Sequence, residues 1–423
     1  MKAATLQSNT ISDLSSVLEF VLENKYSDFY KKKYVVEKIE INSYEDFQKI
    51  PLLEKKELLE TKLEDRIFDD KNNIVNYLFS SGTTGAPLIS AHSTPFFPDP
   101  KDFFDPRYKQ TLILMPLSIT AASILALSKD FVAVPGDINN LPLTAQLLNQ
   151  SSINSLATTP TILEFLIKEL EKINFDLNRF KFIIVTGEAC SEERLSAFKE
   201  KFSSARVVTV WGATELGGGL GYQCEPLTSL ATNTFHLNHK FLFCEIINEQ
   251  GLPAEIGEEG EIVMTMLFQG TSVLIRYRTG DLGTITKSDC PCGNPYTVRL
   301  LGRSEHRNLK FHGVIMHANM IEKSLNGVKE YIEPGFRMHI FEKEINGKKI
   351  PELEIHLILK DKNSEKENSF TERIRQSISA NMRFSEKNTL SSLVEQKVFL
   401  PLQIKFVDEW PREAKAKLIT PHF

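Results

Sequence analysis

Short apolar runs separated by amphipathic stretches form the main pattern of the chain from residue 74 onward. The runs at 111–115 and 131–134 are consistent with buried strands, those at 182–186 and 206–210 with further strands, and the run at 74–79 favours β structure. Thr159 and Pro160 predict the start of a helix between two of them. The apolar face of that helix would consist of Ile162, Phe165, Leu166 and Leu170. Strands that alternate with helices in this way predict an α/β fold with mostly parallel sheets flanked by helices.

The two ends of the chain have a different character. Before about residue 70 the pattern is helical, with Leu14, Val17, Leu18 and Val21 on one face and a helix start at Ser43 and Asp46. Beyond Gly302–Arg303 we expect a hairpin turn at Asn346–Gly347, a charged helix at about 369–382 opened by Ser369 and Glu372, and a strand at 402–407. We therefore predict a large domain at 1–303, with a helical lead-in at about 1–70, and a small mobile α+β domain at 304–423.

Composition narrows the class of protein. The 423 residues are 41% hydrophobic and 25% charged, with a net charge of −5, so the broad basic excess of a nucleic-acid binder is missing. The first residues have no apolar signal region, and no run is long enough to span a membrane. Five cysteines in a chain of this length do not indicate a disulfide framework. We expect a cytoplasmic protein without nucleic-acid or membrane partners.

A run of hydroxyl and glycine residues follows the first predicted strand. It comprises Ser80, Ser81, Gly82, Thr83, Thr84 and Gly85. Hydroxyls and exposed backbone N–H groups in a turn can surround phosphate oxygens, and glycines allow a close approach. A Gly-Lys-Ser/Thr ending is missing, so this is not a Walker loop. A phosphate loop and a plain surface loop both remain open at this point.

Residues with binding chemistry follow other predicted strands. Gly187-Glu188-Ala189 comes after the run at 182–186, and Trp211-Gly212-Ala213-Thr214-Glu215 comes after the run at 206–210. In parallel sheets, ligands collect at the carboxyl ends of strands. An indole offers a stacking face for a base, and a carboxylate offers hard oxygens for Mg²⁺. Asp281 lies in Tyr277–Gly283, where a carboxylate after a glycine turn can accept ribose hydroxyls.

Taken in order, these motifs resemble those of the adenylate-forming superfamily, and in particular its phenylacetate–CoA ligase-like branch. The resemblance rests on Ser-Gly-Thr-Thr-Gly before Pro87, on 211–215 and on 277–283. It implies that Glu215 holds Mg²⁺ and that Thr214 approaches the phosphate. It also implies that ATP or AMP is bound by Ser80, Ser81, Gly82, Thr83, Thr84, Gly85, Gly187, Glu188, Ala189, Trp211, Gly212, Ala213, Asp281 and Arg303. The residues next to the acid pocket would be Gly217, Gly218 and Gly219; a flexible loop is the alternative for them.

Two further matches lie near the end of the large domain and of the chain. Leu301–Glu305 resembles the hinge between the family's domains, with Glu305 in place of the usual aspartate; a surface Arg303–Glu305 pair is the alternative. Trp410–Leu418 resembles the segment with the catalytic lysine, which would be Lys415, although Ala414 replaces a glycine. A lysine ammonium suits charge that develops between a carboxylate and an α-phosphate. Lys417 and a simple basic tail are the alternatives.

Four residues suit a tetrahedral structural zinc site: Cys224, His236, Cys290 and Cys292. Cys290-Pro-Cys292 is too tight for an easy disulfide, and the resembling branch has a similar set. Free thiols are the alternative. Cys190 and Cys244 are expected in the core.

The sequence therefore predicts an acid–thiol ligase that forms AMP. It would use ATP and Mg²⁺ to convert a carboxylic acid, an aryl or related small acid, to acyl-AMP with release of pyrophosphate, and would then form a thioester with CoA. Transfer to a carrier protein, amine or reductase partner without CoA is one alternative, and a nucleotide-binding protein without turnover is another. A homodimer is compatible with either. The lysine that usually stands beside the loop proline is missing, since Ala86 and Leu88 flank Pro87.

Overall fold

The computed structural model describes residues 10–34, 39–80, 87–93, 105, 107–116, 132–188, 190, 192–230, 233–248, 250–303, 309–311, 314–316, 318–345, 347–361, 368–384, 388–410 and 419–422. The chain forms two compact units, Met1–Leu301 and Gly302–Phe423. The division into two functional domains at residue 303 stays a prediction, because compactness alone says nothing about independent movement. Among the described residues, no helix is both long and apolar enough to cross a membrane.

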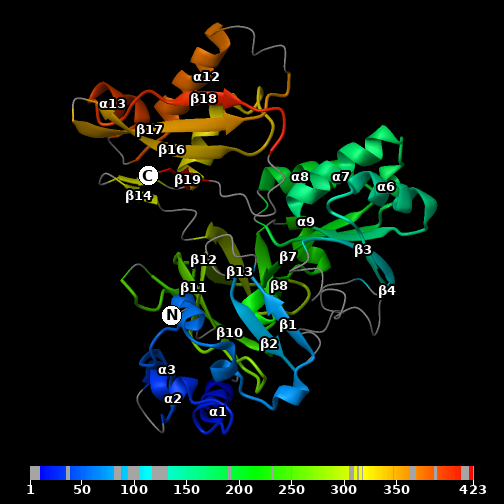
Figure 1. Ribbon diagram of the computed structural model, residues 1–423, viewed down its shortest axis with the longest axis vertical. Coiled ribbons are helices and arrows are strands. Elements are labelled where there is room, and N and C mark those ends of the chain that lie inside the picture. Colours follow the sequence, from blue (N-terminus) through cyan, green and yellow to red (C-terminus); the bar gives the residue numbers. More distant parts are fainter. Residues whose placement is uncertain are drawn as a thin grey trace. The chain divides into compact units, whose positions relative to one another are not determined.

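The first unit contains a mixed sheet whose strands follow the order β10-β11-β12-β13-β9-β8-β7-β6-β5-β3-β4 (Figure 1). Its parallel part consists of β3 (Gln110–Leu114), β4 (Val132–Pro135), β5 (Ser155–Thr158), β6 (Phe182–Thr186) and β7 (Arg206–Ala213). The helices between these strands are α6 (Leu141–Gln150), α7 (Pro160–Lys172) and α8 (Glu192–Lys201), with a 3-10 turn η5 (Leu177–Arg179). Their apolar side chains share one core with β3, β5, β6 and β7, whereas β4 at the edge of the sheet is only partly buried, so the expectation of a buried strand at 131–134 was wrong. Thr159 caps α7 and Pro160 opens it, as the sequence predicts.

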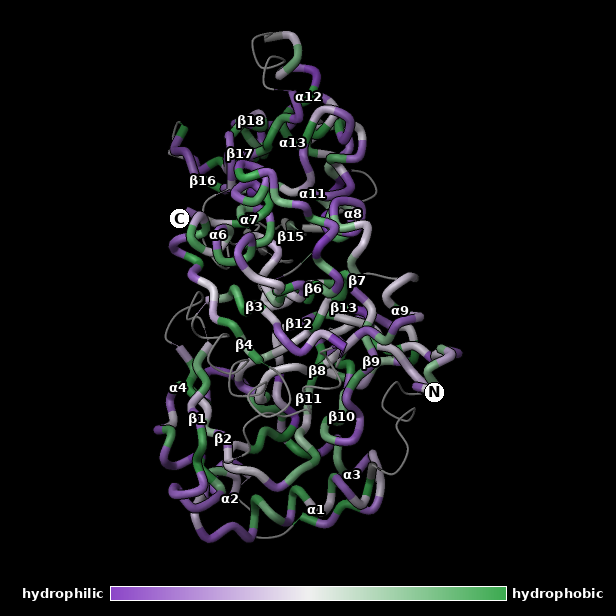
Figure 2. Tube along the Cα trace, turned by 90° about the vertical axis from the view of Figure 1, so that its right-hand side faces the viewer, coloured by the Kyte–Doolittle hydropathy of each residue, from purple (hydrophilic) through white to green (hydrophobic). Residues whose placement is uncertain are grey.

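The other strands of this sheet pair mainly antiparallel. They are β8 (Gly218–Tyr222), β9 (Thr234–Leu237), β10 (Leu242–Ile247), β11 (Gly260–Met266), β12 (Tyr277–Lys287) and β13 (Tyr296–Arg303). Most of them are joined by short connections, which allow antiparallel pairing, whereas a parallel pair needs a long crossover. The α/β class is confirmed, and the parallel arrangement is limited to the part from β3 to β7. Figure 2 shows hydrophobic residues, in green, along β3 and β4 of the parallel part.

The N-terminal part of this unit is helical, as predicted. It contains α1 (Thr10–Leu22), α2 (Phe29–Tyr34), α3 (Tyr44–Gln48), α4 (Lys55–Glu60), η2 (Leu63–Arg66) and η3 (Lys71–Asn73). A separate two-stranded sheet of β1 (Asn76–Phe79) and β2 (Ile89–His92) follows. The predicted face of α1 is buried, and the Ser43 hydroxyl accepts a hydrogen bond from the Asp46 N–H. The lead-in helices share one core with β9 to β13.

The second unit is an α+β structure around a four-stranded sheet with the order β18-β17-β16-β19. Its elements are β14 (Leu309–Phe311), β15 (Val314–Met316), α11 (Ala318–Ser324), η7 (Leu325–Val328), β16 (Arg337–Ile345), β17 (Lys348–Leu357), α12 (Asn368–Asn381), α13 (Leu390–Glu395), β18 (Gln403–Phe406) and β19 (Ile419–Pro421). The predicted hairpin, the helix and the strand at 402–407 are present as β16–β17, α12 and β18, and β19 follows as a further strand that was not predicted. Gly347 has a φ of 74°, as a tight hairpin turn requires.

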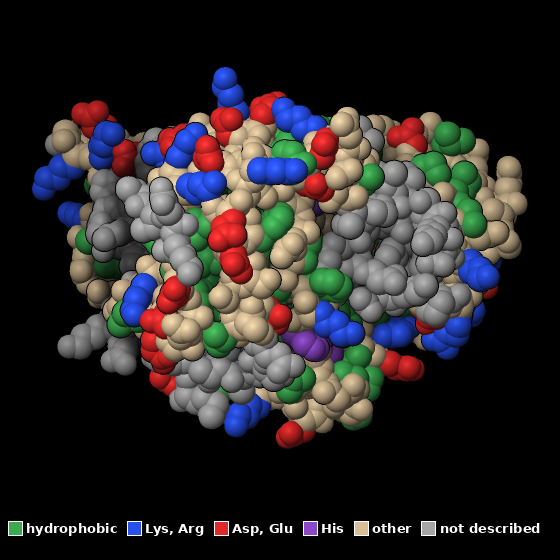
Figure 3. All heavy atoms as spheres, turned by 90° about the horizontal axis from the view of Figure 1, so that it is seen from below, with side chains coloured by type: hydrophobic (Ala, Val, Ile, Leu, Met, Phe, Trp, Pro, Cys, Tyr) green, Lys and Arg blue, Asp and Glu red, His purple; other side chains and the backbone are tan. Residues whose placement is uncertain are grey.

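The surface view in Figure 3 shows acidic and basic side chains interspersed on one face. Neither sign gathers there into a broad area among the described residues. A face of this kind creates no strong single-sign field.

Candidate functional site

The end of β7 brings several of the predicted site residues together. Trp211 is buried on this strand, and the 3-10 turn η6 (Thr214–Leu216) follows it directly. Gly212 lies so close to β8 that an added Cβ would be 2.8 Å from the Gly218 carbonyl oxygen. A larger residue at 212 would therefore push β8 away from the strand that carries Trp211.

Two hydrogen bonds join this segment to β12, where the predicted ribose motif lies. The Trp211 Nε1–H donates to Asp281 Oδ2 at 3.0 Å, and the Tyr277 hydroxyl donates to Glu215 Oε1 at 2.8 Å. All four side chains are buried, and the two carboxylates are each 8% exposed. The structure thus brings Trp211, Glu215 and Asp281 to one place, although β7 and β12 are not neighbours in the sheet.

The loop predicted to bind phosphate starts beside this place. Ser80 closes the base of the loop, because its N–H donates to the Leu88 carbonyl while its hydroxyl accepts from the Leu88 N–H, both at 2.9 Å. On β2, the strand that follows the loop, the Ser90 hydroxyl donates to the carbonyl oxygen of Thr214 at 3.3 Å. The β1–β2 hairpin is therefore tied to η6. The loop residues Ser81, Gly82, Thr83, Thr84 and Gly85 lie outside the described residues.

The segment after β6 lies next to β7, because Thr186 pairs with Val210 in the parallel ladder. Gly187 has a φ of 82°, which turns the chain at the strand end. The Glu188 side chain accepts from the N–H and the hydroxyl of Thr161 at the start of α7, at 3.2 and 2.6 Å. Burial raises the pKa of this carboxyl above its ordinary value. A contact of Glu188 with a base would thus come from its backbone. Ala189 lies outside the described residues.

The three glycines expected beside an acid pocket form no flexible loop. Gly217 ends η6 with a φ of 88°, and Gly218 and Gly219 begin β8. Farther along β8, a Cβ on Gly221 would lie 3.2 Å from Trp211 Cε3 and 2.8 Å from Phe235 Cβ. The missing side chain at 221 thus leaves the space that the indole occupies, a role that the sequence reasoning did not assign.

Besides the loop residues and Ala189, three further predicted residues cannot be placed in the site. Glu305 and Lys415 lie outside the described residues, as does the alternative Lys417. Arg303 ends β13, but its side chain is also outside the described part. The hinge and the catalytic lysine therefore stay predictions.

The sequence reasoning missed two buried groups close to the site. His92 on β2 is 8% exposed, its Nε2 lies 3.0 Å from the Ser90 hydroxyl, and burial lowers its pKa to about 4. Arg276, directly before Tyr277, makes a two-pronged ion pair with the fully buried Glu245, with both N–O distances at 3.0 Å. Single histidines and arginines have no motif around them, so the sequence offered no signal for either.

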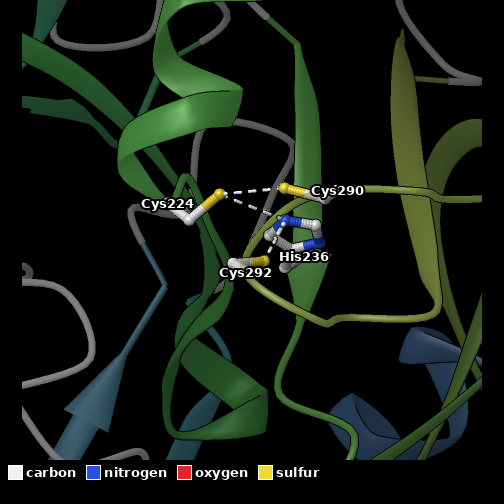
Figure 4. A group of neighbouring side chains, drawn as sticks. All are labelled: Cys224, His236, Cys290 and Cys292. Atoms are coloured by element: carbon white, nitrogen blue, oxygen red, sulfur yellow. Dashed lines mark hydrogen bonds between the residues drawn. The ribbon is translucent and has the colours of Figure 1, made fainter.

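The four predicted metal ligands meet in one cluster (Figure 4), and one ligand atom from each lies within 4.8 Å of all the others. Cys224 Sγ is 3.3 Å from His236 Nε2 and 3.4 Å from Cys290 Sγ, and Cys292 Sγ is 3.2 Å from His236 Nε2. These distances are close to the edges of a tetrahedron with Zn–S and Zn–N bonds of about 2.3 and 2.0 Å.

The surroundings of the cluster also suit a cation. His236 Nδ1 lies 3.3 Å from the carbonyl oxygen of Tyr296, a partner that leaves Nε2 facing the cysteines. Burial lowers the pKa of His236, which favours the neutral imidazole that binds metals. Burial raises the pKa of Cys224 to about 12, and a bound cation would reverse that shift by stabilising the thiolate. The donor set therefore fits Zn²⁺.

The family model described as AMP-binding enzyme matches residues 19–273. This chain belongs to the AMP-binding enzyme family, and the resemblance to adenylate-forming enzymes is confirmed.

Among individual relatives, phenylacetate-coenzyme A ligase of Escherichia coli (strain K12) is 23% identical over 76% of this chain and 77% of its own length. D-alanine--D-alanyl carrier protein ligase of Bacillus cytotoxicus is 26% identical over 39% of this chain. The match spans only 31% of the length of that relative.

Solved structures share the architecture. A 2-hydroxyisobutyryl-CoA ligase in complex with 2-HIB-AMP aligns with a TM-score of 0.76 and 16% identity, over 100% of this chain and 90% of the other. The amide bond synthetase McbA from Marinactinospora thermotolerans aligns with a TM-score of 0.54 and 15% identity, over 85% and 69%. At these identities the likeness establishes the fold alone.

Proposed function

We propose that the protein activates a carboxylic acid with ATP, releasing pyrophosphate, and passes the acyl group from acyl-AMP to the thiol of CoA. The observation that supports this most is the meeting of Trp211, Glu215 and Asp281 at one buried place beside the base of the Ser80 loop. An aromatic face, a carboxylate for ribose and a carboxylate for Mg²⁺ are the groups that a nucleotide site of this family needs. Family membership and the relatives named above point to the same reaction.

In the first step, a carboxylate oxygen of the acid attacks the α-phosphorus of ATP, and the bond from that phosphorus to the pyrophosphate oxygen breaks. Asp281 would accept the ribose hydroxyls and Trp211 would flank the base. Glu215 would hold Mg²⁺, which supplies positive charge for the phosphate oxygens. The hydroxyls and N–H groups of Ser80–Gly85 would bind phosphate, with Thr214 beside them. Lys415 would stabilise the charge that develops on the reacting oxygens.

In the second step, the CoA sulfur attacks the acyl carbonyl, the thiol proton is lost to solvent, and AMP leaves. We propose that a rotation near Arg303–Glu305 separates the two steps. The acid is proposed to be an aryl or related small acid that binds near Gly217, Gly218 and Gly219. The similarity to a carrier protein ligase keeps a carrier protein as the alternative acceptor.

Exchange of labelled pyrophosphate into ATP, tested with a panel of aryl, alkyl and amino acids, tests the first step. At least one acid should stimulate exchange, and Asp281→Ala should lower it by about a hundredfold or more, since a ribose contact and a buried charge are lost. Asp28→Asn, which changes a carboxylate of the N-terminal helical part whose side chain is 60% exposed, is the matched control. ATP binding without exchange for any acid would leave a nucleotide-binding protein without turnover. Product analysis with and without CoA then identifies the acceptor.

The lysine assignment has its own test. Lys415→Ala should abolish exchange, whereas Lys417→Ala should leave most of it. The opposite result would move the catalytic role to Lys417, and full exchange in both variants would remove it from this segment.

We also propose that Cys224, His236, Cys290 and Cys292 hold a structural Zn²⁺. Metal analysis of the purified protein should find about one zinc per chain, and Cys290→Ser and Cys292→Ser should each lower it, with a lower melting temperature. Cys244→Ala, which changes a buried cysteine outside the cluster, should keep the zinc. Undiminished zinc in both serine variants would exclude these ligands.

A further inference from the structure

The two hydrogen bonds between β7–η6 and β12 have a reciprocal pattern. Residues 211 and 215 are four positions apart, and so are 277 and 281. The aromatic residue at the start of each segment donates to the carboxylate at the end of the other: Trp211 to Asp281, and Tyr277 to Glu215. Each carboxylate of the candidate nucleotide site is therefore held by the other segment's aromatic residue, not by its own.

The two strands that these bonds join lie far apart in the order of the sheet. From β7 to β12 the order is β7-β8-β9-β13-β12, which amounts to four strand spacings, or about 19 Å in a flat sheet. The side chains nevertheless meet at 3.0 and 2.8 Å. The sheet must curl between the two strands for this to happen, and the two bonds fix the curled arrangement at the site.

The packing around the indole supports a fixed position. Gly221 leaves space for the ring, and the Trp211 and Phe235 ring centroids lie 6.3 Å apart. The indole is 6% exposed and Tyr277 only 1%. Side chains held in this way can orient a carboxylate without the freedom of a surface group.

We propose that Trp211 and Tyr277 are positioning residues, each of which orients the opposite carboxylate: Trp211 aims Asp281 at the ribose hydroxyls, and Tyr277 aims Glu215 at Mg²⁺. The proposal rests on the proposed function for the roles of Asp281 and Glu215. It adds a role for Tyr277, and it gives the Trp211 N–H a task separate from stacking on a base.

The proposal predicts that two conservative variants have separable effects on nucleotide binding, measured by calorimetry on the full chain. Trp211→Phe keeps an aromatic face and removes the N–H. The preference for ATP over 2′-deoxy-ATP, taken as the ratio of dissociation constants, should fall by about fivefold to tenfold, in the range expected for the loss of one ordinary hydrogen bond. Its Mg²⁺ requirement should stay unchanged.

Tyr277→Phe removes only the hydroxyl oxygen. The Mg²⁺ concentration needed for half-maximal ATP binding should rise by about fivefold to tenfold, while the preference for ATP over 2′-deoxy-ATP should stay. Tyr34→Phe is the matched control, because the buried Tyr34 hydroxyl has no hydrogen-bond partner among the described residues. This control should change neither quantity.

If Trp211 and Tyr277 had a purely structural role, each variant would change the preference for ATP over 2′-deoxy-ATP and the Mg²⁺ requirement together, or would change only the melting temperature. Either result would overturn the proposal. If Trp211→Phe does not fold, Tyr277→Phe decides, because it keeps every carbon atom of the packed ring. A wild-type protein that binds ATP but shows no acid-dependent exchange ends the proposed function only, since the binding ratios still test the positioning. A wild-type protein that binds neither nucleotide ends both.

Discussion

Buried carboxylates occur in two neighbouring regions of the first unit, and they are held in different ways. Glu245 is fully buried and bound by the guanidinium of Arg276, with a further bond from the Tyr44 hydroxyl at 3.0 Å. Glu215 and Asp281 are also buried, and each accepts a hydrogen bond from an uncharged side chain: Glu215 from Tyr277 and Asp281 from Trp211. A carboxylate already paired with arginine has little attraction left for an outside cation. Hydrogen bonds from neutral donors do not offset the negative charge of a carboxylate, so that charge stays available to an outside cation.

The difference separates a structural role from a binding role. Burial raises the pKa of Glu245, and Arg276 counters that shift. The same guanidinium donates to the carbonyl oxygens of Gln48 and Ile50, so it fastens the lead-in after α3 to the strand that carries the predicted ribose motif. This pair therefore holds two parts of the unit together, whereas Glu215 and Asp281 are the carboxylates that we propose to meet a ligand.

The largest expected effect comes from breaking the buried ion pair. Arg276→Met leaves Glu245 buried without its cation, which should lower the free energy of unfolding in urea by about 3–5 kcal/mol. Arg278→Met is the control two residues away, because the Arg278 side chain is 42% exposed where it pairs with Glu54 and Glu261. That variant should lose at most about 1 kcal/mol. Equal losses in the two variants would contradict the comparison.

The next effect concerns His92, a buried group near the site that forms no ion pair within the described part of the chain. Its pKa is about 4 in the folded protein and 6.5 ordinarily. As the pH falls from 6.5 towards 4, the unfolded chain gains a proton that the folded chain does not bind. The free energy of unfolding should therefore fall by up to about 1.4 kcal/mol per pH unit in this window, and His92→Gln should remove that component. If the free energy of unfolding changes with pH equally in wild type and variant, His92 is not the cause of that change.

A smaller effect tests the space that Gly221 leaves for the Trp211 indole. Gly221→Ala places a methyl group against Phe235 and Trp211, so we expect a loss of about 1–3 kcal/mol in the free energy of unfolding. In addition, the preference for ATP over 2′-deoxy-ATP should weaken if the ring shifts. Gly327→Ala is the control, since its added carbon would meet only the ends of the Ser377 and Asn381 side chains, which can turn away. Stability and nucleotide preference unchanged from wild type would show that the indole needs no such space.

Much of the local structure followed from the sequence, because it depends on neighbouring residues. Thr159 and Pro160 start α7, Ser43 caps α3, and Gly347 has the positive φ of a hairpin turn before β17, each by a rule that acts within a few positions. Cys224, His236, Cys290 and Cys292 do lie in one cluster, as the tight Cys-x-Cys and the distinctive soft donor types indicated, and their binding of a metal stays a prediction.

Contacts between distant segments were harder to predict. Nothing in 211–215 or 277–283 says which side chain of one motif bonds to which of the other, since that depends on how far the sheet curls. The glycines at 217–219 pointed to a pocket or a loop, yet local spacing could not show that β8 begins there and packs against Gly212. The Arg276–Glu245 pair could not be predicted for the same reason, because Glu245 lies on β10 and Arg276 lies directly before β12.

The docking of the lead-in has a consequence for how the chain is made. Leu53 exchanges backbone hydrogen bonds with Arg276 and Arg278, and Gln48 lies 228 positions before the arginine that binds its carbonyl. At about 5–20 residues per second, a ribosome needs roughly 10–45 s to synthesise that interval. During this time the apolar faces of α1 and α3 lack the surface that covers them in the finished fold. This segment thus depends on a strand made much later, which makes it a natural client for a chaperone.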